Sequence, residues 1–331
     1  MAAELPRALT AAIATLMQGR SRKDLSERSG KISRRYRDVG SSTGVVEGEA
    51  DAMAYAVARM PATFAAASEV FERLLERCPD FSPARALDLG AGPGTASWAI
   101  AELWPDIAEI IQVDRNAAFL DLARVLAADA DSPALQAPRQ LTADLVGWAG
   151  PAEPFHLMVL GYALTELPPA RLPGLIAKLW SRCAGALVIV EPGTPAGYAR
   201  ILSMRDRLIG EGARILAPCP HEAPCPLTPP DWCHFAVRLQ RSRDHMSAKS
   251  ATLPYEDEKF AYLVAVRPAL FAPPAADRLL DRPDASKIGV AMKLCGTDGA
   301  LHVSTVPKRD REAFARARKL KWGDLVDVPR G

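Results

Sequence analysis

The stretch R-A-L-D-L-G-A-G-P-G-T, residues 85–95, decides the expected fold. Its apolar residues lead through the acid Asp88 into Gly90, Gly92 and Gly94, and the apolar run A-S-W-A-I-A-E-L-W follows. Glycines allow positive φ and let the backbone approach a ligand closely. The start of a helix offers unpaired N–H groups to a polar or anionic ligand. The stretch therefore predicts a strand, a ligand-binding turn and a helix.

The order of acid and glycines distinguishes two kinds of cofactor site. Dinucleotide sites read G-x-G-x-x-G, whereas here the acid comes first, as D-x-G-x-G-x-G-T. This order resembles motif I of class I S-adenosylmethionine (SAM)-dependent methyltransferases, which implies that Asp88 and the glycines line the methionine end of SAM. A second expected strand, I-I-Q-V-D, ends in Asp114, an acid suited to a ribose diol.

Strand and helix patterns alternate from residue 85 to residue 191, as in a doubly wound α/β sheet. Further strands are expected at 138–142, 155–162 and 186–191, and helices at about 95–104, 116–128 and 169–182. Ligands of such sheets lie beyond the carboxyl ends of the strands. Asp144 and Tyr162 follow the third and fourth strands, so we expect Asp144 near the adenine and Tyr162 at the same site.

Length and composition leave several function classes open. The chain has 331 residues, a formal net charge of +2 and six cysteines, and no apolar run approaches the ~20 residues that span a bilayer. Such a length allows one large domain or two, and the small net charge does not by itself favour nucleic acid. The first residues, M-A-A-E-L, fit a secretory signal badly. We expect a cytoplasmic protein, or a mitochondrial one if the chain is eukaryotic.

Residues 1–80 are expected to form an N-terminal helical extension with a basic segment. Positions 3–17 have a helical period, and the run 19–44 is rich in Arg, Lys, Ser and Gly, which favours an irregular surface segment or a phosphate-contacting arm. A helical pattern at 47–78 contains Pro61, whose missing N–H predicts an end or a kink. We therefore expect two helices before the sheet.

Four cysteines form a candidate metal site. Cys219, Cys225 and Cys233 are spaced C-x5-C-x7-C among prolines, and Cys295 follows in K-L-C-G-T. Four thiolates can complete a tetrahedral zinc site or an iron–sulfur cluster. Zinc sites usually use C-x2–4-C pairs, so the wide spacing favours a cluster, with a structural or redox-sensing role. Three histidines are alternative ligands: His221, His234 and His245.

Five segments carry a more specific resemblance: R-M-P-A-T (59–63), A-P-C-P-H (217–221), D-W-C-H-F (231–235), L-P-Y-E-D-E-K-F-A-Y (253–262) and V-P-K-R-D-R-E (306–312). Together they resemble the methyltransferase-like family of the mitochondrial small ribosomal subunit, in its bacterial branch, over nearly the whole chain. The resemblance implies a class I methyltransferase fold and a role in small-subunit assembly and translation. It also implies that a 4Fe-4S cluster is held by four residues: Cys219, Cys225, Cys233 and Cys295.

Two groups of basic residues in the C-terminal half indicate an RNA partner. The first group follows the cysteines: Arg238, Arg241, Arg243 and Lys249. The second group lies along an expected final helix: Lys308, Arg309, Arg311, Arg316, Arg318, Lys319 and Lys321. Basic side chains at this density neutralise phosphates and make binding salt-dependent. A solvated basic helix with no partner is the alternative interpretation.

The sequence thus predicts a SAM-binding Rossmann-like core at 81–200 and a C-terminal part, 201–331, that completes the sheet and carries the cluster and the RNA contacts. We expect an iron–sulfur, rRNA-binding factor for small-ribosomal-subunit assembly, monomeric off the ribosome and without a membrane partner. The alternatives are an active SAM-dependent rRNA methyltransferase and a small-molecule methyltransferase with structural zinc. No N-P-P-Y-type loop follows the fourth strand, where G-Y-A-L stands, so the catalytic residues are unassigned and turnover is doubtful.

Overall fold

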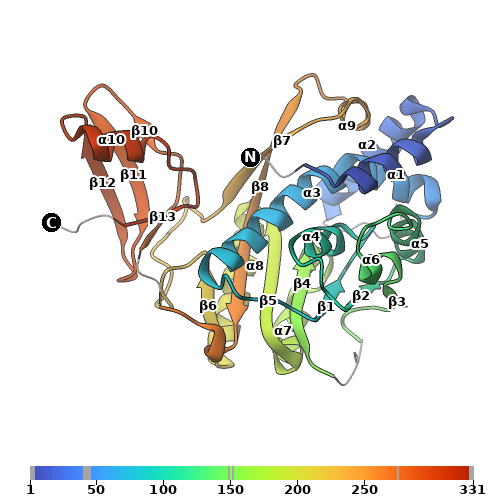
Figure 1. Cartoon of the computed structure of the whole chain (residues 1–331), viewed down its shortest axis with the longest axis horizontal. Helices are drawn as coiled ribbons and strands as arrows, with labels where there is room; N and C mark the ends of the chain where they lie inside the picture. The colour runs from blue at the N-terminus through green and yellow to red at the C-terminus, as the bar shows by residue number, and fades with distance from the viewer. Residues whose placement is uncertain (1–3, 40–45, 148–149, 151–152, 274–275, 328–331) are drawn as a thin grey trace.

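The computed structural model describes residues 4–39, 46–147, 150, 153–273 and 276–327, the side chains of 36–39 excepted. In these residues the chain forms an eight-stranded mixed sheet and a separate five-stranded sheet near the C-terminus (Figure 1). No helix among them is long and apolar enough to cross a bilayer.

The larger sheet begins with five parallel strands: β1 (Arg85–Leu89), β2 (Glu109–Asp114), β3 (Arg139–Thr142), β4 (Phe155–Gly161) and β5 (Cys183–Pro192). Three further strands complete it: β6 (Arg214–Ala217), β7 (Phe235–Gln240) and β8 (Tyr255–Val266). The order is β3-β2-β1-β4-β5-β8-β6, β7 also pairs with β8, and β8 runs antiparallel to β5, β6 and β7. The order reverses at β1, so the expected Rossmann-like methyltransferase fold is confirmed.

Helices cover both faces of this sheet because its central strands are apolar on both sides. Successive residues of a strand point to opposite faces. Leu157 and Val159 therefore pack in the core with α3 (Glu49–Arg77), α4 (Thr95–Leu103) and α5 (Ala117–Leu126), while Met158 and Leu160 pack with α7 (Leu172–Arg182) and α8 (Pro195–Gly210). Short helical turns complete this region: α6 (Pro133–Gln136), η1 (Leu164–Glu166), η2 (Pro169–Arg171), α9 (Arg243–Ala248) and η3 (Pro268–Leu270).

The N-terminal extension consists of α1 (Arg7–Met17), α2 (Arg22–Val39) and α3 (Glu49–Arg77), and two expectations about it are wrong. The basic segment forms α2 instead of an irregular loop, because Leu25 and Ile32 lie on one buried side of an otherwise polar helix. Helix α3 continues through Pro61 as a single helix across the sheet (Figure 1). Its buried apolar residues on both sides of the proline offset the one lost hydrogen bond.

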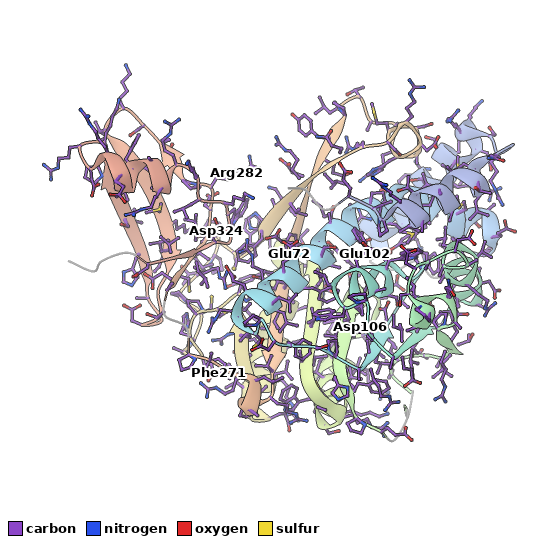
Figure 2. The ribbon with its side chains drawn as sticks, viewed as in Figure 1. Glu72, Glu102, Asp106, Phe271, Arg282 and Asp324 are labelled. Carbon is purple, nitrogen blue, oxygen red and sulfur yellow. The ribbon has the colours of Figure 1, made fainter. Side chains whose placement is uncertain are left out.

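The smaller sheet contains β9 (Asp277–Leu279), β10 (Asp284–Ala285), β11 (Gly289–Cys295), β12 (Leu301–Pro307) and β13 (Leu325–Val326), with α10 (Arg311–Ala317) beside it. Its small core includes Leu279, Val290 and Leu294. Four ion pairs among the described residues join it to the rest of the molecule: Asp324 with Arg73 of α3 at 3.3 Å, Arg282 with Asp257 of β8 at 3.2 Å, Arg278 with Glu76 of α3 at 3.4 Å, and Lys293 with Asp231. Figure 2 labels Asp324 and Arg282. The domain boundaries after residues 80 and 200 stay predictions.

Candidate functional site

The turn after β1 has the conformation that its glycines predict. Gly90, Gly92 and Gly94 have φ values of +70°, +54° and +83°, where a side chain is strained. A Cβ at Gly90 would lie 2.6 Å from the Cβ of Ala163, and one at Gly94 would lie 2.9 Å from Nε2 of Gln112. A Cβ at Gly92 would meet nothing within 4 Å. The positive φ favours glycine at all three positions, close packing against Ala163 adds to this at position 90, and position 92 faces open space.

Asp88 and Asp114 have different surroundings. Asp88 is buried and accepts hydrogen bonds from Ser97 N at 3.0 Å and Ser97 Oγ at 2.7 Å, so it holds the first turn of α4. Burial raises the pKa of Asp88 to about 6, partly opposed by the hydrogen bonds from Ser97. Asp114 accepts from the backbone N–H groups of Gly92 and Asn116, both at 2.8 Å. Burial also raises the pKa of Asp114.

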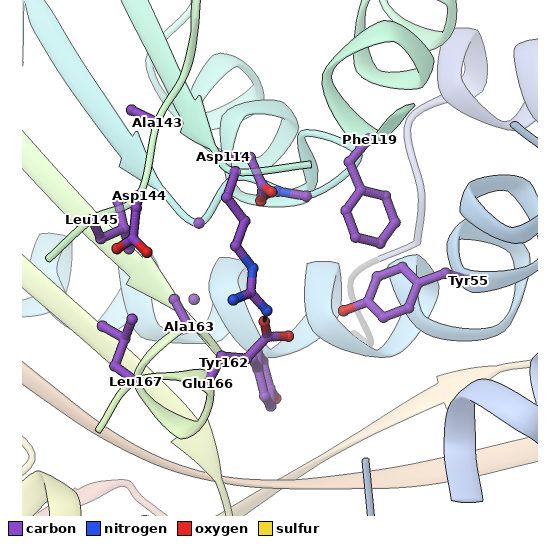
Figure 3. A pocket seen from close by; sticks show the side chains of 14 residues that line it. Tyr55, Asp114, Phe119, Ala143, Asp144, Leu145, Tyr162, Ala163, Glu166 and Leu167 are labelled. Atoms are coloured by element: carbon purple, nitrogen blue, oxygen red, sulfur yellow. Dashed lines mark hydrogen bonds and ion pairs between the residues drawn. The ribbon is translucent and has the colours of Figure 1, made fainter. Parts of the chain in front are cut away.

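A pocket of about 70 Å³ lies at the carboxyl ends of β1, β2 and β4 (Figure 3). Five of the seven residues expected at the cofactor site line it: Gly90, Gly92, Asp114, Asp144 and Tyr162. The other two, Asp88 and Gly94, are not among its lining residues, so a contact of either with a ligand stays a prediction. The sequence reasoning missed other lining residues, including Tyr55, Arg115 and Phe119. Tyr55 belongs to α3, and no local pattern links that helix to the glycine turn.

Tyr162 connects this pocket to a buried ion pair. Its φ is +60°, unusual for a tyrosine, and its hydroxyl donates to Oε1 of Glu258 at 3.0 Å. Arg59 of α3 contacts the same carboxylate oxygen through Nη2 at 3.3 Å. Burial and the Glu258 carboxylate raise the pKa of the Tyr162 phenol, which therefore stays protonated. The phenol is fixed as a hydrogen-bond donor to Glu258 in the wall of the pocket.

The four candidate cysteine ligands come together around an interior cavity of about 30 Å³. Three of them belong to the loop between β6 and β7, and Cys295 ends β11 of the smaller sheet. Burial, and then the neighbouring thiols, raises the pKa of Cys233 and Cys295. Tyr198 lies with its hydroxyl 3.1 Å from Sγ of Cys225. The structure thus brings together cysteines that lie up to 76 positions apart in the chain, from Cys219 to Cys295.

Two buried arginines hold the backbone around this cavity. Nη2 of Arg205 donates to the carbonyls of His221 and Ala223 at 3.0 and 2.8 Å, and Nε of Arg278 donates to that of Pro218 at 3.0 Å. Arg205 and Arg278 are each 1% exposed and line the cavity, so they place positive charge beside the thiols. This positive charge favours the thiolate form of the neighbouring cysteines.

The histidines do not extend the cysteine group. Nε2 of His221 lies 3.3 Å from Sγ of Cys295, but His221 does not line the cavity. His234 stacks on Trp232 with ring centroids 5.0 Å apart, and His245 is buried beside Glu256 at 3.4 Å. Within the described ranges, no group of three or more His, Cys, Asp or Glu side chains is arranged to hold a metal ion. The cysteines therefore surround a cavity without converging on one point.

The two basic groups differ in their surroundings. Most of the first is paired with acids of β8: Arg238 with Asp257 at 2.6 Å, and Arg241 and Lys249 with Glu256. All seven residues of the second group are exposed, and an ion pair joins Arg316 to Glu312 at 2.9 Å. Helix α10 is shorter than the basic run, which extends over both of its ends. The second group therefore presents more uncompensated charge than the first.

Comparison with known proteins identifies the family. The family model described as mitochondrial small ribosomal subunit Rsm22 matches residues 49–327. The human protein named "Ribosome assembly protein METTL17, mitochondrial" is 30% identical over 294 residues, which cover 83% of this chain and 62% of that protein. The chain belongs to the Rsm22 family. The matched segment spans less than two thirds of the length of METTL17.

A curated enzyme and a solved structure are also similar to this chain. Trans-aconitate 2-methyltransferase of Azoarcus sp. is 33% identical over 164 residues, which cover 45% of this Rsm22-family chain and 57% of that enzyme. The crystal structure of magnesium protoporphyrin IX methyltransferase from Synechocystis PCC 6803 with bound SAM is 18% identical and has a TM-score of 0.40. It covers 76% of this chain and 99% of that one. At this identity and TM-score, the similarity to the crystal structure gives no information about ligand or activity.

Proposed function

We propose that this Rsm22-family protein assists assembly of the small ribosomal subunit, holds a 4Fe-4S cluster and binds SAM. The observation that carries the proposal is the gathering of four cysteines, from two distant segments, around one cavity between the two sheets. The family's description and the printed name of METTL17 support the ribosomal role. We propose that the protein lies in the same compartment as the ribosome that it serves, which is the cytoplasm of a bacterium, or the mitochondrion if the chain is eukaryotic.

The chemistry of the cysteine group fits an iron–sulfur cluster. Clusters are held by four cysteine thiolates, and a cluster is wider than a single ion, so thiols spread around a cavity suit it. The buried guanidinium groups of Arg205 and Arg278 supply charge that complements an anionic centre. The cluster, when bound, supplies a compact cross-link with redox capacity. The four residues that hold it join the loop after β6 to the end of β11.

The pocket beside the glycine turn fits SAM by its polar groups. Asp114 offers a carboxylate to a ribose diol, Asp144 lies where the adenine is expected, and Gly92 leaves room for the backbone to approach the ligand. Its volume of about 70 Å³ is below the roughly 300 Å³ typical of sites that enclose a small organic ligand. We therefore propose that SAM enters with a local opening of this pocket.

The RNA partner is proposed from the second basic group. Seven exposed cations from Lys308 to Lys321 can each approach a phosphate, and such contacts dominate nonspecific affinity for RNA. The first group has fewer free charges because β8 supplies acidic partners. Small-subunit rRNA is the partner that the ribosomal role implies, and we propose that the protein is monomeric when it is off the ribosome.

Two other functions have some support. An active rRNA methyltransferase is favoured by the acidic side chains at the carboxyl ends of β2 and β4, where a SAM-type cofactor would react. A small-molecule methyltransferase with structural zinc is favoured by the likeness to trans-aconitate 2-methyltransferase. That second function requires the cysteines to converge on one ion.

An absorption spectrum of the full chain purified without oxygen, with iron, sulfide and zinc assayed on the same sample, tests the proposal. We expect a brown protein with a broad visible band and iron equal to sulfide. A colourless protein with about one zinc per chain would contradict the cluster and favour the small-molecule enzyme. Calorimetry with SAM, followed by transfer of tritiated methyl groups to small-subunit RNA, then separates an assembly factor from a methyltransferase.

A further inference from the structure

A cavity of about 690 Å³ adjoins the candidate SAM pocket. It lies between α2 and α3 on one side and η1, the start of α8 and the end of α9 on the other. Tyr55 and Tyr162 line both spaces, so the two cavities share a wall. The volume is within the roughly 300–1,000 Å³ of sites that enclose a small organic ligand. No part of the proposed function uses this space.

The two adjoining cavities have opposite charge. Three carboxylates and one cation line the SAM pocket: Asp114, Asp144, Glu166 and Arg115. Among the described residues, four cations and no carboxylate line the larger cavity: Arg34, Arg59, Arg200 and Lys249. Six hydroxyl side chains accompany these cations: Ser26, Ser29, Ser33, Thr165, Thr194 and Ser250. A space with this lining favours an anion with several hydrogen-bond acceptors.

Three of these cations form ion pairs with glutamates outside the cavity lining: Arg59 with Glu258, Arg200 with Glu191, and Lys249 with Glu256. The side chains of Glu258, Glu191 and Glu256 are 10%, 0% and 12% exposed, and none of them lines the cavity. The cations remain 33%, 22% and 20% exposed in the same order. These ion pairs compensate the charges of the three cations, but Arg59 and Arg200 each pair through one nitrogen, so other N–H donors of the two guanidinium groups remain for a ligand.

The fourth cation lies at the α2 side of the cavity. Arg34 is exposed, whereas the cations on α3, α8 and α9 are half-buried. Tyr55 and Tyr162 lie at the boundary with the SAM pocket. Aromatic side chains at the end of a basic groove are the features that bind the base of a single-stranded nucleotide whose phosphate contacts the cations.

We propose that this basic cavity binds one nucleotide through its phosphate, with the base directed toward Tyr55 and Tyr162. The nucleotide comes either from an unpaired position of an RNA strand or from the free pool, because both present the same phosphate, ribose and base. The RNA source rests on the proposed ribosomal function, whereas the free source does not. Either source brings an acceptor base to the wall that the cavity shares with the SAM pocket.

Calorimetry on the full chain tests the proposal with four probes: the 5′-monophosphates of the common ribonucleosides, the matching nucleosides, inorganic phosphate, and a single-stranded RNA hexamer. We expect the monophosphates or the hexamer to bind at least about tenfold more tightly than both nucleosides and inorganic phosphate, since phosphate and base each contribute. Binding of the hexamer alone assigns the site to RNA, and binding of monophosphates alone assigns it to free nucleotides.

Two variants and one matched control locate the binding. Arg34→Glu reverses a lining charge, and we expect about tenfold weaker binding of the nucleotide probe. Arg35→Glu makes the same charge change at the next exposed residue, which does not line the cavity, and we expect little effect. Ala196→Trp places a large ring in the cavity from an exposed position in the first turn of α8 and should reduce binding by a similar factor.

Several outcomes would overturn the proposal. These are no binding of monophosphate or hexamer by folded protein, equal binding of inorganic phosphate, or equal effects of the variants at positions 34 and 35. The cluster absorption and the SAM affinity are measured on the same preparations. If both are intact while nucleotides fail to bind, only the cavity proposal falls. If cluster or SAM binding is absent while nucleotides bind, the proposed function falls and the cavity proposal stands.

Discussion

Nη2 of Arg115 donates to Oε2 of Glu166 at 2.7 Å, and this ion pair joins the segment after β2 to the η1 turn after β4. Because β1 lies between β2 and β4, the pair passes over the glycine turn and narrows the proposed SAM pocket (Figure 3). We expect a ligand that fills the pocket to displace this ion pair.

Removing this ion pair should strengthen SAM binding. Half-exposed ion pairs contribute about 0.2–1 kcal/mol, so Glu166→Gln is expected to raise the affinity about two- to fivefold in calorimetry. Asp121→Asn removes a comparable partner from Arg124, outside the pocket, and should leave the affinity unchanged. Weaker binding in Glu166→Gln would mean that the Glu166 carboxylate contacts SAM itself.

Two glycines of the pocket should respond differently to alanine. Gly90→Ala forces a side chain to φ +70° and against Ala163, so it should lower the free energy of unfolding by about 1–3 kcal/mol. Gly161→Ala adds a methyl group with nothing within 4 Å of it, so stability should stay within about 0.5 kcal/mol of the parent. SAM affinity should nevertheless fall, because Gly161 lines the pocket. Urea unfolding and calorimetry measure the two effects, and unchanged SAM affinity would place the ligand elsewhere.

The buried carboxyl of Asp88 should make stability fall as pH rises. Its pKa is about 6 in the folded protein against an ordinary value of 3.8, so the folded state binds more protons between these values. The contribution is complete below about pH 4 and is lost as pH rises through 6, on the order of 3 kcal/mol in total. Asp88→Asn keeps an acceptor for Ser97 and should remove this pH dependence.

Asp106→Asn, at an exposed aspartate after α4, is the control for Asp88→Asn (Figure 2). Urea unfolding of all three proteins at several values from pH 4 to pH 8 gives the comparison. If the stability difference between the parent protein and Asp88→Asn does not change with pH, then the carboxyl of Asp88 has no raised pKa.

The proposed cluster should couple colour to RNA binding. Cys225→Ser removes one ligand and should abolish the visible absorption and weaken binding of small-subunit rRNA together, because the loop after β6 is no longer joined to β11. Cys78→Ser is the control, since Cys78 lies outside the cavity and its thiol donates to the carbonyl of Leu270, as a hydroxyl can. RNA binding that survives loss of colour would refute the coupling.

The exposed cations around α10 should set the salt dependence of RNA binding. Arg309→Ala and Lys319→Ala should each weaken binding to all RNA sequences similarly and reduce the salt slope by about 1. Arg238→Ala removes the same charge from a residue that contacts Asp257 through both Nε and Nη2, and should change the slope less. Equal slopes for Arg238→Ala and Lys319→Ala would assign the RNA contact to β7 as well.

The glycine motif predicted its own surroundings because its signals are local. Three glycines after an apolar run specify a strand, a turn and a helix start, and all three occur at β1 and α4. Asp114 could be placed because parallel strands end at a common edge. Tyr55 and the Arg115–Glu166 pair could not, because they depend on how α3 and η1 pack.

Charge was harder to interpret from sequence alone. Arg238, Arg241 and Lys249 form a basic group in the sequence, but β8 pairs beside β7 and places acids against them. The basic segment before residue 40 contains few apolar residues. Two of them, Leu25 and Ile32, nevertheless lie on one buried face, and the segment packs against the rest of the protein as helix α2. In both places the partner lies far away in the chain, where local composition carries no information about it.

The side chain of Tyr162 lines both the acidic pocket beside the glycine turn and the larger basic cavity, and its hydroxyl donates a hydrogen bond to Glu258. A displacement of this ring toward one cavity would reduce that cavity and enlarge the other. If ligands fill both cavities and one of them moves this ring, it changes the affinity of the other, and the second ligand then changes the affinity of the first by the same factor. A substitution at residue 162 is therefore expected to change the ligand affinities of both cavities.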